Sequence, residues 1–210
     1  MRGWSVSSTR SVVSVVAAVA VISGAGATSA AASSGPDPFV ADGNCVIDPA
    51  RPEITVDSLR YHCTTEQSDA LFSAAQPGAA PEGKKRFWVL PAVVVAGQPI
   101  AYPLGRAWAA AEGILGDALT FDNGPTGQPM VRKNYAFGMS PGGPLLPGIS
   151  YSDGKPAWTV DFSNDTAGVP VSSHEFREIA PDVWLGRSYL LQKWNPLPGS
   201  PVHGSYVITS

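Results

Sequence analysis

One stretch of the sequence concentrates residue types that bind charged ligands and transfer protons. Residues 171–191, VSSHEFREIAPDVWLGRSYLL, contain a histidine, two glutamates and two arginines. A guanidinium group binds a carboxylate through paired donors, and imidazole and carboxyl groups act as acids and bases. The stretch therefore has three interpretations: a reaction centre, a ligand clamp, or the charged outer face of a strand pair.

The same stretch has the pattern of a β-hairpin that turns at Pro181. Because the side chains of a strand alternate between its two faces, Glu175, Arg177, Arg187 and Tyr189 share one face. The expected cross-strand pairs are Ser173–Tyr189, Glu175–Arg187, Arg177–Leu185 and Ile179–Val183. The opposite face carries His174, Phe176, Glu178, Trp184 and Leu190.

The role of this cluster depends on which face of the hairpin is turned inward. If Glu175, Arg177, Arg187 and Tyr189 face an enclosed lumen, we expect them to bind a ligand. Arg187 would then hold a carboxylate or enolate oxygen, and Glu175 would orient Arg187. If they face solvent, Glu175 and Arg187 form an exposed ion pair worth about 0–1 kcal/mol. A catalytic cluster is the third alternative, for which the sequence identifies no catalytic residue.

Two further motifs suggest chemistry, but their surroundings do not support it. Residues 138–142, GMSPG, match the Gly-x-Ser-x-Gly elbow of hydrolases, which needs a helix directly after the serine. Pro141 begins a Pro-Gly-Gly-Pro run that cannot start that helix, so we expect no hydrolase based on Ser140. The run HEFRE at 174–178 lacks the second histidine of a zinc helix. We predict neither a metal site nor a cofactor.

The N-terminal segment has the three parts of a secretory signal peptide. Arg2 and Arg10 precede an apolar run at 11–27, and small residues follow as far as Ala32. This order is typical of export. We therefore predict a signal peptide over 1–32, a flexible leader over 33–44, and one secreted or cell-envelope domain over 45–210. No later run is long and apolar enough to span a bilayer.

The charge of the chain argues against polyanionic partners. The sequence has 14 Lys and Arg against 17 Asp and Glu, a formal net charge of −3. Removal of the predicted signal peptide takes away two arginines and no acid, so the remaining domain is more acidic. Because the basic residues are also scattered, we do not expect nucleic acid or anionic lipid as a partner.

Cys45 and Cys63 are the only cysteines of the chain. In an exported protein such a pair most often closes a disulfide, here with an expected stabilisation of about 3 kcal/mol. The next residues, 64–75, begin with Thr64 and have Gln67 three positions later, which is a capping-box pattern. We predict a short helix there, ending before the Pro-Gly pair that follows.

From residue 86 onward, short apolar runs alternate with Gly and Pro turns. Strands are expected over 86–90, 92–97, 118–123, 129–139, 149–163, 171–191 and 204–210, the fifth and sixth of these ranges being hairpins. Residues 105–116 fit neither helix nor strand clearly, and 140–148 are expected to form a loop. About eight antiparallel strands without βαβ alternation predict an all-β, up-and-down barrel with a short N-terminal helix. A β-sandwich is the alternative.

Two segments carry a family resemblance. Residues 152–165, SDGKPAWTVDFSND, and 174–190, HEFREIAPDVWLGRSYL, resemble the late strands of small bacterial secreted lipocalin-like (calycin) proteins. The Gly-x-Trp that opens lipocalin barrels is missing from the start of the domain. The resemblance implies an eight-stranded barrel with a cavity.

We therefore hypothesise a secreted binding module for a small hydrophobic molecule. One alternative is an enzyme of the cyclase or isomerase type, which uses the same cavity with an acid such as Glu175. The other is a cell-envelope interaction protein with a filled barrel. A lumen packed with Trp and Phe would favour the last, because it leaves no room for a ligand.

Overall fold

The computed structural model describes residues 41–95, 97–162, 172–190 and 202–210, which belong to one compact unit, Pro36–Ser210. The predicted signal peptide over 1–32 and most of the predicted leader lie outside the described residues.

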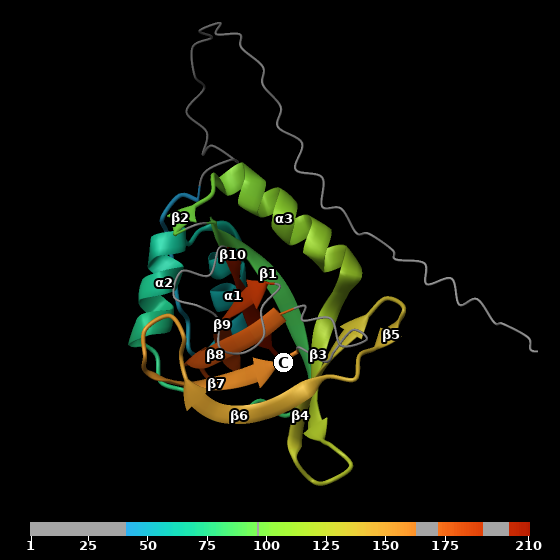
Figure 1. Cartoon of the computed structure of the whole chain (residues 1–210). Helices are drawn as coiled ribbons and strands as arrows, with labels where there is room; N and C mark the ends of the chain where they lie inside the picture. The colour runs from blue at the N-terminus through green and yellow to red at the C-terminus, as the bar shows by residue number, and fades with distance from the viewer. Residues whose placement is uncertain (1–40, 96, 163–171, 191–201) are drawn as a thin grey trace, which may run out of the picture. The chain divides into compact units, whose positions relative to one another are not determined.

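Eight strands, each antiparallel to its neighbours, close into a barrel (Figure 1). In order around the barrel they are β1 (Gly83–Val95), β3 (Gly116–Asn123), β4 (Pro129–Tyr135), β6 (Gly143–Ile149), β7 (Pro156–Asp161), β8 (Ser172–Ala180), β9 (Val183–Leu190) and β10 (Val202–Thr209). Pairing of β10 with β1 closes the ring, so none of these strands is left with a free edge. The prediction of an all-β, up-and-down barrel is confirmed. Two-residue strands β2 (Gln98–Pro99) and β5 (Gly138–Met139) pair with β1 and β4.

Three helices accompany the barrel in the part of the chain that the structure describes: α1 (Pro52–Tyr61), α2 (Thr65–Ala74) and α3 (Tyr102–Leu115). The predicted capping box of α2 is present, with the Thr64 hydroxyl accepting from the Gln67 N–H and the Gln67 side chain accepting from the Thr64 N–H. Helix α1 was not expected. It begins with Pro52, a residue favoured at the first helical position, but Arg51 before it provides no side-chain cap. Residues 105–115 of the ambiguous segment belong to α3, and its last residue, Gly116, begins β3.

Strand β6 is the second element that the sequence did not predict. It lies within the Pro- and Gly-rich segment that was expected to be a loop, and it contains Pro144 and Pro147. Both prolines take positions in the ladders, Pro144 opposite Met130 and Pro147 opposite Trp158. A proline is tolerated in a strand where its missing N–H is not needed for pairing.

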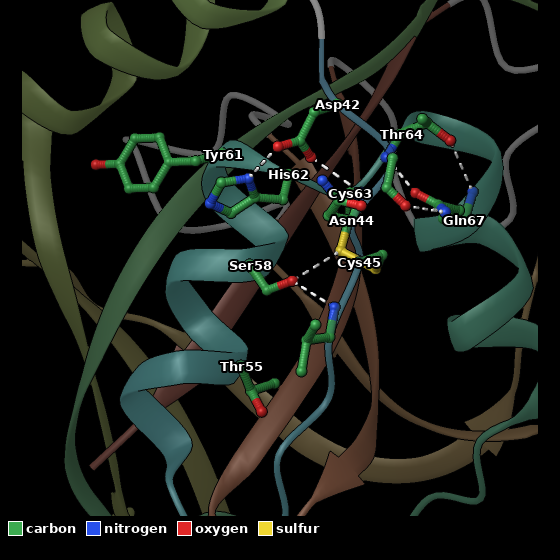
Figure 2. The surroundings of a disulfide bond; sticks show 12 residues. Asp42, Asn44, Cys45, Thr55, Ser58, Tyr61, His62, Cys63, Thr64 and Gln67 are labelled. Carbon is green, nitrogen blue, oxygen red and sulfur yellow. Dashed lines mark hydrogen bonds and ion pairs between the residues drawn. A yellow bond between two sulfur atoms is a disulfide. The ribbon is translucent and has the colours of Figure 1, made fainter. Parts of the chain in front are cut away.

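The predicted disulfide between Cys45 and Cys63 is present and joins the start of the domain to the end of α1 (Figure 2). Ser58 of α1 lies beside it, with Oγ 3.6 Å from Cys63 Sγ and 2.6 Å from the Val46 backbone nitrogen. The bridge therefore holds the segment before α1 against the helix.

Two apolar cores lie on opposite sides of the barrel wall. The outer core joins α1 and α2 to the outside of β1, β9 and β10, and includes Val56, Leu59, Phe72, Leu90, Leu185 and Val207. The inner core lies in the lumen and includes Leu119, Phe121, Val131, Phe162, Phe176, Trp184 and Ile208. Adjacent residues of one strand therefore serve different cores, as the twofold alternation of a strand requires. None of the described helices has the length and apolar character to cross a membrane.

The hairpin of β8 and β9 has almost the predicted register. Glu175 lies opposite Arg187 and Arg177 opposite Leu185, as expected. Near the turn a bulge follows Glu178, so that Ala180, and not Ile179, pairs with Val183. The predicted division of the hairpin into two faces is therefore correct.

Candidate functional site

The predicted ligand-binding residues lie on the outer face of the barrel wall. Leu185 shares this face and belongs to the outer core, whereas Phe176 and Trp184 on the opposite face belong to the inner core. The lumen orientation considered for Glu175, Arg177, Arg187 and Tyr189 is therefore wrong. The solvent-exposed alternative is wrong as well, because all four residues are buried. Helix α2 and the 150–155 turn, which supply their partners, cover this part of the outer face.

Arg177 joins three elements to one another. All five of its N–H donors are used: Nε donates to the Pro156 carbonyl, and the terminal nitrogens donate to Asp153 and to the carbonyls of Phe72 and Lys155. The bidentate contacts to Asp153 are both 2.7 Å. The hydrogen bond from Arg177 holds the pKa of Asp153 well below its usual range. This is the arrangement of a structural cross-link.

The carboxylate of Glu175 also accepts several hydrogen bonds from the protein. Its carboxylate accepts from the hydroxyls of Ser150, Ser152 and Tyr189 and from the Tyr151 backbone N–H, at 2.7–3.1 Å. Burial, and after it the nearby Glu175 carboxylate, raises the pKa of the Tyr189 hydroxyl, so this hydroxyl remains a donor. Glu175 does not face the lumen, so it is not placed to act as an acid on a substrate bound there.

Arg187 is paired with Asp69 of α2 at 2.6 Å and lies over the Phe72 ring. The ion pair expected between Glu175 and Arg187 is therefore not formed, although the two residues are direct neighbours across the hairpin. Each finds a closer partner in the layer that covers the barrel. This part of the predicted site fastens the covering layer to the wall.

A cavity of about 180 Å³ lies in the lumen, at the end where β3, β8 and β10 begin and β4 and β9 end. Its apolar and aromatic lining consists of Phe87, Val89, Trp108, Ala118, Leu119, Tyr135 and Tyr206. Its polar lining includes Lys133, Asn134, Ser172, His174, Ser188 and Ser205, and glycines 116 and 204 complete the wall. The other end of the lumen is filled by inner-core side chains that do not line the cavity, among them Phe121, Phe176 and Trp184. The barrel is therefore packed at one end and hollow at the other.

Four polar side chains of the cavity wall form a continuous chain. Lys133 Nζ donates to Ser172 Oγ at 2.9 Å, and Ser172 Oγ lies 3.0 Å from His174 Nε2. Ser188 Oγ, on the neighbouring strand, lies 3.1 Å from the same nitrogen. These residues come from β4, β8 and β9, and strand alternation turns Ser172, His174 and Ser188 to one face.

Burial, together with the positive charge of Lys133, lowers the pKa of His174 well below its usual value. The ring is therefore neutral at pH 7, with one nitrogen as donor and the other as acceptor. Ser172 accepts from Lys133, which leaves its own proton free for Nε2. In that arrangement Nδ1 carries the ring proton, and Nδ1 is buried without a hydrogen-bond partner among the described residues.

The sequence did not reveal the cavity residues, because they are far apart in the chain. His174 was predicted on the correct face of the hairpin, but that face was not identified as the inner one, and Ser172 was assigned to neither face. Lys133 gave no signal, since a lysine in a strand is usually exposed. Ser140 is followed by strand β6 and not by a helix, in agreement with the expectation that it forms no nucleophile elbow.

Comparison with known protein families, with curated proteins and with solved structures finds no match for this chain.

Proposed function

We propose that this protein is a secreted, lipocalin-like binding module that carries a small hydrophobic molecule in the hollow end of its barrel. The observation that carries the proposal is the cavity itself: mostly apolar walls with a few converging polar groups, which is the usual character of a small-molecule site. The volume is below the roughly 300–1,000 Å³ typical for drug-sized ligands. The ligand, or the part of it that is enclosed, is therefore small.

The two alternatives have less support. A filled barrel requires large side chains throughout the lumen, whereas Phe121, Phe176 and Trp184 pack one end and the cavity lies at the other. An enzyme that relies on Glu175 requires that carboxylate to face the substrate. Glu175 lies instead on the outer face, where it accepts four hydrogen bonds from its own chain.

We also propose that the protein is exported. The disulfide between Cys45 and Cys63 fits an oxidising compartment, as does the signal-peptide pattern of the first 32 residues. A secreted carrier would meet its ligand outside the cytoplasm.

The test is to purify the protein after secretion by its own host, extract it with organic solvent, and identify retained small molecules by mass spectrometry. Gly204 lies on the cavity wall, and a Cβ there would meet only Val93, at 3.9 Å. Gly204→Val should therefore fill part of the cavity and reduce the retained ligand at least about tenfold, because extra side-chain volume competes for the same space.

Gly113→Val is the matched control, since Gly113 is exposed on α3 and a Cβ there meets no neighbour within 4 Å. This variant should retain as much ligand as the wild type. Equal retention by Gly204→Val and the wild type would show that the cavity is not the binding site.

A further inference from the structure

We infer that Trp108 of α3 sets the size of the molecule that the lumen cavity accepts, and limits it to a compact hydrophobic compound of about one ring. This inference rests on the proposed binding function and names the residue that decides its specificity. Removal of the indole ring should admit larger hydrophobic molecules.

The first observation is the length of the connection that carries Trp108. Strands β1 and β3 are antiparallel neighbours, and such strands can be joined by as few as about two residues. Residues 96–115 separate them here, and α3 occupies most of that connection (Figure 1). The start of β3 lies at the hollow end of the barrel, and so does the end of β1, because the two strands are antiparallel. Helix α3 is therefore more than the strand pairing requires, and it lies where the cavity is.

Helix α3 is held close to the barrel at Gly105, which is buried. A side chain at this position would collide with the Pro91 carbonyl of β1. Trp108 follows three positions later, and residues three apart lie on the same side of a helix. The side of α3 that contacts β1 therefore also directs the indole ring toward the lumen.

The start of α3 is also attached to the end of α1. The Tyr102 hydroxyl donates to the Tyr61 carbonyl at 3.3 Å, and Arg106 donates to the Arg60 carbonyl at 3.2 Å. Both carbonyls belong to the last turn of α1, where a helix has no internal partner for them. These two hydrogen bonds position the first turns of α3, and with them the residue that enters the cavity wall.

Most of the described side chains of α3 are exposed. Leu104 is 62% exposed, and Ala107, Ala110 and Ala111 are exposed as well. A helix that turns these apolar side chains to solvent adds little to either core. Trp108 differs from them, because it is the one residue of α3 among the described residues that line the cavity. The contribution of α3 to the lumen is therefore this single large ring.

The ring of Trp108 faces a cavity with other aromatic side chains in its wall. Phe87 of β1, Tyr135 of β4 and Tyr206 of β10 line the same space of about 180 Å³. An apolar cavity of about 150 Å³ is large enough to bind benzene. The space therefore holds about one ring, and a molecule with several rings needs the volume that the indole group occupies.

Two neutral probes of different size test the inference. Toluene has one ring, and N-phenyl-1-naphthylamine has three and fluoresces more strongly in apolar surroundings. The secreted wild-type protein should bind toluene, measured by calorimetry, and should cause little rise in the fluorescence of the larger probe.

Trp108→Ala should bind the larger probe at least about tenfold more tightly than the wild type does, because the surrounding structure refills the space of a removed side chain only in part. Toluene should displace the larger probe from this variant, which would show that both probes occupy the lumen. If Trp108→Ala fails to fold, as judged by circular dichroism, Trp108→Phe takes its place. It keeps an aromatic ring of smaller size and should show a smaller gain in the same direction.

Trp88→Ala is the matched control. Trp88 is partly buried, as Trp108 is, but it packs against the outer core and does not line the cavity. The guanidinium groups of Arg60 and Arg86 lie over its ring, so the space that it leaves is polar. This variant should bind the larger probe no better than the wild type does.

The outcomes separate the inference from the proposed function. Equal binding of the larger probe by the wild type and the Trp108 variant, with toluene bound by both, would overturn the role of Trp108 and leave the binding function standing. Absence of toluene binding in the wild type, with no small molecule retained by the secreted protein, would overturn the proposed function itself.

Discussion

At the scale of single residues, the same charged types serve two different purposes on the two faces of one hairpin. Arg177 on the outer face uses every donor it has within the protein. His174 on the inner face keeps one ring nitrogen without a partner among the described residues. A buried polar group whose hydrogen bonds are all made stabilises the structure, whereas a buried polar group without a partner costs free energy. On the outer face, Arg187 also keeps one buried nitrogen, Nε, without a partner among the described residues.

Replacement of Arg177 should strongly destabilise the protein. Arg177→Met leaves the Asp153 carboxylate without its buried partner, so the free energy of unfolding should fall by about 3–5 kcal/mol. Urea unfolding measures this loss. Arg51→Met is the comparison, because the Arg51 side chain is 62% exposed in its ion pair with Asp48, and its loss should be only about 0–1 kcal/mol. Similar small losses in both variants would mean that Arg177 is not a structural cross-link.

His174 should make the protein sensitive to acid. The folded protein keeps its ring neutral, because burial lowers its pKa, whereas the unfolded chain takes up the proton below about pH 6.5. Below that pH the unfolded state binds more protons, so stability falls as the pH falls, by up to about 1.4 kcal/mol per pH unit for one group. Burial lowers the pKa of His203 as well, which adds to the loss in the same direction.

Urea unfolding at pH 7 and pH 5 tests this dependence. His174→Gln should lose about 1–2 kcal/mol less than the wild type between the two values, since the titrating group is gone. Ser188→Ala removes a neighbour of the ring and keeps the imidazole, so it should retain the wild-type pH dependence. An unchanged pH dependence in His174→Gln would contradict a neutral buried ring.

At the scale of elements, the layer formed by α1 and α2 determines the role of the barrel wall beneath it. Phe72 of α2 lies under the guanidinium groups of both Arg177 and Arg187, and Asp69 of α2 pairs with Arg187. Two short helices are marginal alone and depend on packing against the barrel. The disulfide between Cys45 and Cys63 helps to hold them in place.

Removal of the disulfide should lower the free energy of unfolding by about 3 kcal/mol, because the unfolded chain regains the freedom of the closed loop. The double variant Cys45→Ala, Cys63→Ala tests this by urea unfolding. Reductant should destabilise the wild type by a similar amount and leave the double variant unchanged. A loss below about 1 kcal/mol would mean that packing alone fixes α1.

At the scale of the whole molecule, the barrel wall is buried on both sides where the helices cover it. Leu185 on β9 belongs to the outer core and Ile208 on β10 to the inner core, and both are almost completely buried. Strands that separate two cores couple them mechanically. We therefore expect the barrel and its helical layer to unfold together.

Leu185→Ala and Ile208→Ala should each lower the free energy of unfolding by about 2–5 kcal/mol, and each variant should still unfold in a single transition. Tryptophan fluorescence and far-ultraviolet circular dichroism should report the same midpoint. Leu104→Ala is the control, since Leu104 is 62% exposed on α3, and its effect should be within about 0.5 kcal/mol. Two separate transitions in Leu185→Ala would show that the helical layer unfolds on its own.

The sequence by itself determined the features that depend on local pattern. The number of short strands and the lack of βαβ alternation predicted the barrel. Strand alternation predicted the Glu175–Arg187 register and the division of the hairpin into two faces. Thr64 and Gln67 predicted the start of α2, and the only two cysteines predicted the disulfide. The signal peptide over 1–32 stays a prediction, because it lies outside the described residues. Each of these inferences needs only neighbouring residues or a fixed repeat.

Only the tertiary structure decided which face of the hairpin is the inner one. Both faces mix charged and apolar residues, so hydrophobicity alone did not distinguish them. The docking of α1 and α2 buried one face from outside, and α1, which has no side-chain cap at Arg51, was not predicted. The cavity was equally hidden, since Lys133, Ser172 and Ser188 come from three strands and meet only when the barrel closes. Long-range closure brings them together, and no local repeat encodes it.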